Sequence, residues 1–240
     1  MITTLGRSFC TVRTSTGTDV SALEAKVSAL ESTLSKVSYD PTGLNGLPTL
    51  KISGANLQIV NGSGLTFGTL NGLGNVFIGY DEQEGGEQQS GSHNLVMGYS
   101  NDFTSYGGIV AGYNNLISGG LSSVLGGIAN TASGTSSVVS GGSSNKASGA
   151  RSSVSGGSGG EASAVDSAVG GGVNGRASGN YSSVSGGNNG TASGEASSVS
   201  GYESSVSGGT ENLADGFWSS ILGGNTITTT VNRETYPAGP

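Results

Sequence analysis

A hydrophobic residue returns every 15 residues through the second half of this 240-residue chain. A serine stands two residues before each member of this column, on the same side of an extended strand. Repetition at a fixed period indicates a solenoid in which each repeat buries its apolar residues against its neighbours. We therefore expect a roll whose core consists of Val124, Val139, Val154, Val169, Val184 and Val199, then Val206 after only 7 residues, and Ile221 after another 15.

Each repeat carries a second column, of alanine, at Ala132, Ala147, Ala162, Ala177, Ala192 and Ala214. A glycine follows two residues behind each alanine, with Ala164 as the one departure. A coil then consists of two short strands, Ser-x-Val-x-Gly and Asn/Gly-x-Ala-x-Gly, joined by glycine corners that accept a positive φ. Abundant glycine and serine are also typical of a disordered linker. A linker has no reason to keep valine and alanine in register, so the sequence predicts an ordered, all-β roll with 15-residue coils.

The N-terminal part contains a different pattern, in which apolar residues are spaced 3, 4, 3, 4 and 3 apart. This spacing is that of the a and d positions of nearly three heptads. We predict a short coiled coil over residues 18–38; an amphipathic helix packed on its own domain is the alternative, but nothing nearby is apolar enough to receive it. β-Branched a positions with leucine at d nominally favour dimers. The predicted coiled-coil core is Val20, Leu23, Val27, Leu30, Leu34 and Val37.

These patterns divide the chain into five parts. Residues 1–17 form an N-terminal segment, the coiled coil follows, and residues 39–74 form a connector with strand-like runs at 50–53 and 57–60. Residues 75–224 form the roll, whose first coils have bulkier side chains and which carries an acidic inserted loop at 81–93. Residues 225–240 form a C-terminal tail, and Phe217-Trp218 is predicted to cap the open end of the roll.

The core of one such coil is thin. Burying a valine and an alanine contributes about 2–3 kcal/mol, whereas ordering about 15 residues costs far more. Backbone hydrogen bonds between strands offset part of this cost, and we expect packing between coils of different chains to offset the rest. The sequence therefore predicts an oligomer.

The repeat of residues 75–224 resembles the left-handed parallel β-roll in the head domain of YadA-like trimeric autotransporter adhesins. A coiled coil coupled to a roll is also found in that family, although its head usually precedes the stalk. The resemblance implies a homotrimer with three rolls packed about an axis, and a role in adhesion to a host surface, glycan or receptor.

Composition and charge exclude several classes of function. The chain has 16 acidic against 9 basic residues, for a net charge of −7, which argues against nucleic-acid binding. It has no run of about 18 apolar residues that would predict a membrane span. The first residues lack a signal-peptide core. The resemblance to adhesins implies an extracellular or cell-surface protein. The missing signal-peptide core favours the alternative, part of a phage or phage-like particle.

Two strings match catalytic motifs, namely Gly156–Gly160 for a nucleophile elbow and Ser143–Lys146 for Ser-x-x-Lys. A glycine- and serine-rich repeat produces both by chance, and His93 is the only histidine available as a base. The acidic loop is better read as a solvated surface than as a calcium site. We therefore expect no enzyme, no metal and no cofactor.

Aromatic side chains gather near the start of the roll, and two interpretations stay open. They either pack over the corners of the first coils or form an aromatic rim for stacking against sugars. The candidate ligand contacts are Tyr80, Tyr99, Phe103, Tyr106 and Tyr113.

Three functions are compatible with these features. The first is a non-enzymatic, trimeric fibre or adhesin that presents loops to a receptor or glycan, and the second is the tail fibre of a phage or contractile injection system. The third is an ice-binding solenoid, because grass ice-binding proteins resemble this roll in repeat length. Charges of both signs beside the alanine column, at Lys146, Glu161 and Arg176, disfavour ice binding on that face.

Overall fold

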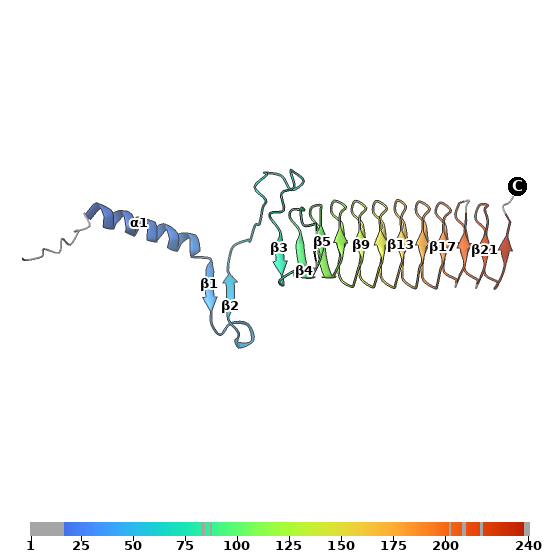
Figure 1. Ribbon diagram of the computed structural model, residues 1–240, viewed down its shortest axis with the longest axis horizontal. Coiled ribbons are helices and arrows are strands. Elements are labelled where there is room, and N and C mark those ends of the chain that lie inside the picture. The colour runs from blue at the N-terminus through green and yellow to red at the C-terminus, as the bar shows by residue number, and fades with distance from the viewer. Residues whose placement is uncertain are drawn as a thin grey trace, which may run out of the picture. The chain divides into compact units, whose positions relative to one another are not determined.

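The computed structural model describes residues 17–82, 85–86, 88–201, 203–207, 210–216 and 218–237. The chain divides into two compact units, Met1–Gln58 and Ile59–Pro240, whose elements are labelled in Figure 1. Each unit is described by itself.

The first unit contains a helix followed by a two-stranded hairpin. Helix α1 (Gly17–Leu34) leads into β1 (Val37–Asp40), a short 3-10 helix η1 (Leu44–Gly46) and β2 (Thr49–Ile52). The two strands pair antiparallel, with Val37 opposite Ile52. The predicted helix over 18–38 is therefore too long at its C-terminal end, because Val37 and Tyr39 alternate with polar residues and are both favoured in strands. The predicted strand at 57–60 is also wrong, since these residues lie outside any strand.

Residues 20–58 of the first unit form no buried core of their own. Among residues 20–58, only Gly43 and Thr49 are even half-buried. The apolar stripe of α1 lies in solvent, with Leu23 at 63% and Leu30 at 59% relative exposure. Within residues 20–58, the apolar side chains of the helix and the hairpin therefore stay exposed.

The second unit is a parallel β-solenoid built from two sheets (Figure 1). The first sheet contains, in spatial order, β3 (Val76–Ile78), β4 (Leu95–Tyr99), β6 (Ile109–Tyr113), β8 (Ser123–Val124), β10 (Val138–Val139), β12 (Ser153–Val154), β14 (Ala168–Val169), β16 (Ser183–Val184), β18 (Ser198–Val199), β20 (Leu213–Ala214) and β22 (Thr228–Thr229). The second contains β5 (Asp102–Phe103), β7 (Leu116–Ile117), β9 (Thr131–Ala132), β11 (Lys146–Ala147), β13 (Glu161–Ala162), β15 (Arg176–Ala177), β17 (Thr191–Ala192), β19 (Ser205–Val206), β21 (Ser220–Ile221) and β23 (Thr235–Tyr236). The predicted solenoid of 15-residue coils is confirmed.

The C-terminal segment continues both sheets. β22 pairs with β20 and β23 pairs with β21, so residues 225–236 form a last coil. The predicted separate tail from residue 225 is wrong. Thr228, Thr229 and Thr235 lack the Ser-x-Val signature, but their β-branched side chains suit the same strand positions.

The half-step at Val206 exchanges the roles of the two sheets. Inward residues normally follow one another by 8 and 7 residues in alternation, as from Val184 to Ala192 and from Ala192 to Val199. Val206 then follows Val199 by 7 residues where 8 would continue the alternation. It pairs with Ala192 in the second sheet, and Ala214 pairs with Val199 in the first. The valine column thus crosses from one sheet to the other without breaking the stack.

The core is a single row of inward side chains from each sheet. The eight valine and isoleucine positions of the sequence column are at most 1% exposed, and the alanines of the second column are fully buried. Val96, Phe103, Val110 and Ile117 fill the corresponding places in the first coils. The serines two residues before the valines are buried too, at 0–1% exposure.

A ladder of buried asparagines closes one edge of the early coils. Asn145 donates its backbone N–H to Oδ1 of Asn130 at 2.9 Å, and its own Oδ1 accepts from the Gly160 N–H at 2.8 Å. Its Nδ2 donates to the carbonyls of Gly141 at 2.9 Å and Gly157 at 3.1 Å. Each asparagine therefore joins three coils. The ladder runs through Asn101, Asn115, Asn130 and Asn145.

The predicted glycine corners with a positive φ are confirmed at the second glycine of several Gly-Gly pairs, as at Gly142 and Gly157, but the other corners differ. Immediately before each buried corner serine or asparagine stands a residue in the left-handed region, and most of these are not glycine. Their N–H groups bond back to the previous coil, as when Arg151 donates to the Thr135 carbonyl at 2.8 Å. That bond offsets the roughly 1–2 kcal/mol that a Cβ costs in this conformation. One such column is Leu121, Ser136, Arg151, Asp166, Tyr181, Ala196, Glu211 and Thr226.

Candidate interaction surfaces

The outer face of the first sheet carries no charged side chain from β3 to β18. We call it the uncharged face. By strand alternation and register, its outward residues are Val76, Ile78, Leu95, Met97, Ile109, Ala111, Ser123, Leu125, Val138, Ser140, Ser153, Ser155, Ala168, Gly170, Ser183, Ser185, Ser198 and Ser200. The first acid in these positions is Asp215.

The first coils make one end of the uncharged face apolar. Val76, Leu95 and Ile109 lie side by side on neighbouring strands, as do Ile78 and Met97. Ile78 is 59% exposed in the single chain. Exposed apolar side chains gathered in this way mark an interaction surface more often than isolated ones do.

The outer face of the second sheet is chemically different. Its outward row contains Lys146, Glu161 and Arg176, of which Glu161 and Arg176 form an ion pair at 3.2 Å between neighbouring coils. Beside this row runs an unbroken column of serines, at Ser118, Ser133, Ser148, Ser163, Ser178, Ser193 and Ser207. Water solvates this face well, so the two faces of the roll are suited to different surroundings.

The aromatic candidates divide into two groups. The rings of Tyr99 and Tyr113 stack on each other, with centroids 5.2 Å apart and planes tilted by 31°. Tyr80 is 93% exposed. The ring of Phe103 is 1% exposed and meets Phe77 edge-on at 5.7 Å, which removes it from any ligand-contacting surface. The ring faces of the tyrosine pair are turned toward each other, which favours their role in thickening the first coils.

Tyr106 also lies against the roll. A Cβ placed on Gly120 would come within 3.1 Å of the Tyr106 ring, so the ring covers this glycine on the neighbouring coil. Tyr80 is therefore the most open of the predicted contacts.

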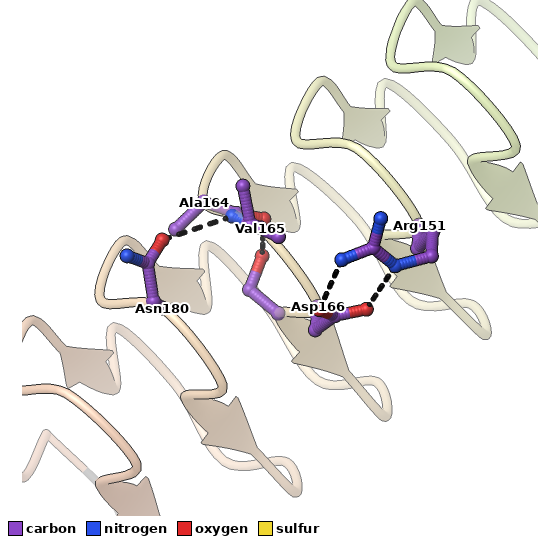
Figure 2. A network of polar contacts seen from close by, with 6 residues as sticks. Arg151, Ala164, Val165, Asp166 and Asn180 are labelled. Carbon is purple, nitrogen blue, oxygen red and sulfur yellow. Dashed lines mark hydrogen bonds and ion pairs between the residues drawn. The ribbon is translucent and has the colours of Figure 1, made fainter.

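Polar side chains staple neighbouring coils at the corners (Figure 2). Arg151 bonds Asp166 through two parallel contacts, Nε to Oδ1 at 2.7 Å and Nη2 to Oδ2 at 2.6 Å. The hydrogen bonds from Arg151 lower the pKa of the Asp166 carboxyl and raise that of the guanidinium. Asn180 Oδ1 accepts from the Val165 N–H at 3.3 Å. These contacts follow the 15-residue period and fasten the stack.

Trp218 belongs to such a staple, which corrects its predicted role as an end cap. Its Nε1 donates to Glu203 at 2.7 Å, and the Arg233 guanidinium carbon lies 5.3 Å from its ring centroid. The coil that contains Arg233 continues the stack beyond it, so Trp218 lies on the side of the roll. Phe217 lies outside the described residues.

The inserted loop is tied into the fold at both ends. Asp81 is only 9% exposed and accepts from the Asn101 N–H at 3.3 Å and from Gln89 Nε2 at 2.7 Å. It thereby adds a first rung to the asparagine ladder. In the part of the chain that the structure describes, no three His, Cys, Asp or Glu side chains come together as a metal site; Glu84 and Glu87 lie outside that part.

The hydrogen bonds of the His93 ring are not made to either of the two catalytic strings. Its ring nitrogens meet the backbone of Asn61 and Thr66, each at 3.1 Å. Lys146 of the Ser-x-x-Lys string lies on the outer face of the second sheet and is exposed.

The fold defines the class of this protein as a parallel β-solenoid repeat protein. No protein-family model matches the chain, and no curated protein is significantly similar to it. No helix among the described residues has the length and hydropathy of a membrane span.

Proposed function

We propose that this chain is a non-enzymatic fibre protein that works as a homotrimer and presents its loops to a receptor or glycan on a host surface. The observation that carries the proposal is the amount of apolar surface that one chain leaves open. That surface lies in the first unit and at the end of the uncharged face formed by β3, β4 and β6.

The first unit supports assembly because its elements are unstable alone. A helix such as α1 gains most of its stability from packing of its apolar face, and an isolated two-stranded hairpin is marginally stable at best in water. The a and d residues of α1 suit identical helices from other copies. In the hairpin, Val37, Tyr39, Leu50 and Ile52 share one face, which needs the same kind of cover.

The uncharged face supports assembly through its size and chemistry. Nine strands spaced about 4.8 Å apart, with about five residues across, give a face on the order of 600 Å². This area approaches the roughly 800 Å² per partner of a standard interface. Three copies follow from the resemblance to adhesin heads, which also supplies the adhesive role and the extracellular location.

Binding of the purified protein to host cells and to immobilised glycans tests the adhesive role. We expect saturable binding that Tyr80→Ala weakens at least tenfold, because this ring is the most exposed of the aromatic candidates. Tyr181→Ala is the matched control, since that ring is also exposed but lies in the middle of the roll. If the protein bound none of the cells and glycans tested, the adhesive role would be contradicted, whereas the proposal of a trimeric fibre would not.

The two alternative functions, a tail fibre and an ice-binding solenoid, predict different experimental results for the same fold. A phage or injection-system tail fibre would share the assembly and would co-purify with a particle. Ice binding is favoured only by the serine column of the second sheet, which repeats once per coil. Thermal hysteresis that Ser148→Tyr and Ser163→Tyr abolish would place ice binding ahead of adhesion.

A further inference from the structure

His93 lies at a corner of the roll, in the left-handed conformation at φ 60°. Nε2 lies 3.1 Å from the backbone nitrogen of Asn61, from which it accepts a hydrogen bond. Nδ1 lies 3.1 Å from the carbonyl oxygen of Thr66. An N–H can only donate and a carbonyl can only accept, so both bonds form together only when the ring is neutral and its proton is on Nδ1.

The residues that His93 holds form a loop at the start of the roll, which we call the N-terminal cap (residues 59–74). Asn61 is 6% exposed and organises the loop from within. Its Nδ2 donates to the Thr69 carbonyl at 3.1 Å, and its own carbonyl accepts from Asn71 Nδ2 at 2.9 Å. A bond to Asn61 therefore ties the whole loop.

Only a few other bonds join the cap to the first coil. The Gly72 N–H donates to the Ser90 carbonyl at 3.1 Å, and its own carbonyl accepts from Asn75 Nδ2 at 3.0 Å. Ser92 Oγ accepts from the Asn71 N–H at 3.2 Å and donates to Asn71 Oδ1 at 3.3 Å. The apolar side chains of the cap add little cover, since Leu65 is 60% and Phe67 is 69% exposed. The two contacts of the imidazole are thus a large share of the attachment.

We propose that His93 is an acid-sensitive latch that holds the N-terminal cap on the roll while its ring is neutral and releases the cap when the ring is protonated. The imidazolium carries a proton on Nε2, which then faces the Asn61 N–H donor to donor. The bond is lost and the nearly buried Asn61 N–H is left without an acceptor. Protonation of the ring and the bond to Asn61 therefore exclude each other, so acidification is the condition that opens the latch.

Neither the cap nor the residues that flank His93 provide an acidic side chain to pair with an imidazolium. The cap has no charged residue, and neither have residues 88–94. Gly107 occupies the equivalent corner of the next coil, and the only titratable side chain beside it is the phenol of Tyr106. The acids Asp81 and Asp102 are bonded to Gln89 and Gln88 in the inserted loop.

Amide hydrogen exchange of the full chain, read by mass spectrometry on peptides covering 59–74, tests the latch. After correction for the intrinsic pH dependence of exchange, we expect protection of the cap to fall at least tenfold between pH 7.5 and pH 5. Peptides covering 124–200 serve as the internal reference and should keep their protection. Equal protection of the cap at both pH values would overturn the proposal, and so would an equal loss in both regions.

His93→Gln separates protonation from other effects of acid, because glutamine stays neutral throughout this range. Cap protection in this variant should not change between pH 7.5 and pH 5. A tenfold fall in the variant would show that another group titrates. If the variant does not fold, nitrogen-15 NMR of the wild-type ring decides: the Nδ1–H tautomer at pH 7.5 is expected, and the Nε2–H tautomer would refute the latch.

Discussion

At the scale of single residues, the stability of the stacked coils depends on buried polar side chains. Asn145→Ala removes an acceptor for Gly160 and a donor to Gly141 and Gly157. Because buried backbone groups lose their partners, we expect a loss of about 3 kcal/mol in the free energy of unfolding. Urea denaturation measures it.

The control for Asn145 is Asn180→Ala. Asn180 is exposed and makes a single long bond of 3.3 Å to Val165. We expect this substitution to change stability by less than about 0.5 kcal/mol. Equal losses in the two variants would show that the ladder has no special role.

We expect the Arg151–Asp166 pair to make a small, pH-dependent contribution to the stability of the folded chain. Arg151 lowers the pKa of Asp166 in the folded state, so the stabilisation is present above the unfolded value of about 3.9 and is lost as the pH falls through the folded value. Thermal melts should show the wild type slightly above Asp166→Asn at pH 6. The difference should shrink as the pH falls below about 3.9, and it should also shrink in 1 M NaCl because the pair is exposed. A difference that does not fall on acidification would count against the ion pair.

At the scale of the half-turn, the two glycines of each Gly-Gly corner have different roles. A Cβ on Gly142, at φ +86°, would lie 2.2 Å from the carbonyl oxygen of Gly157 on the next coil, whereas a Cβ on Gly141 would meet nothing within 4 Å. Gly142→Ala should therefore cost more than about 2 kcal/mol. Gly141→Ala should be within about 0.5 kcal/mol of wild type. Circular-dichroism melts of the pair decide this, and equal melting temperatures would contradict the close stacking of the coils.

The repeat was predictable at this scale because it rests on side-chain columns that the sequence displays directly. Val154 and Ala162 follow such columns, and the paired sheets follow from them. The corners were less predictable, because a residue such as Arg151 adopts a positive φ only through its bond to the preceding coil. Val37 was assigned to the helix since heptad spacing continues through it, whereas its pairing with Ile52 places it in a strand.

The candidate site was predicted less well than the fold. The sequence singled out aromatic residues by type, and burial then separated Phe103 in the core from Tyr80 in solvent. The uncharged face was missed, although the outward positions of successive Ser-x-Val strands contain its signal. Reading that signal requires knowing which strands share a sheet.

At the scale of the whole molecule, the account predicts that a charge on the uncharged face opposes assembly. Ile78→Asp replaces a side chain that is 59% exposed in the single chain, so the roll should still form. Burying the carboxylate between copies is unfavourable, and sedimentation velocity should show at least a tenfold weaker association. Thr131→Asp on the opposite face is the control and should assemble like the wild type.

The absolute mass in solution, measured by multi-angle light scattering on the full chain, tests the central claim most directly. The account predicts a particle of three times the 23.4 kDa chain mass. A stable monomer at micromolar concentration would contradict it, because the stripe of α1 and the uncharged face would then remain in water.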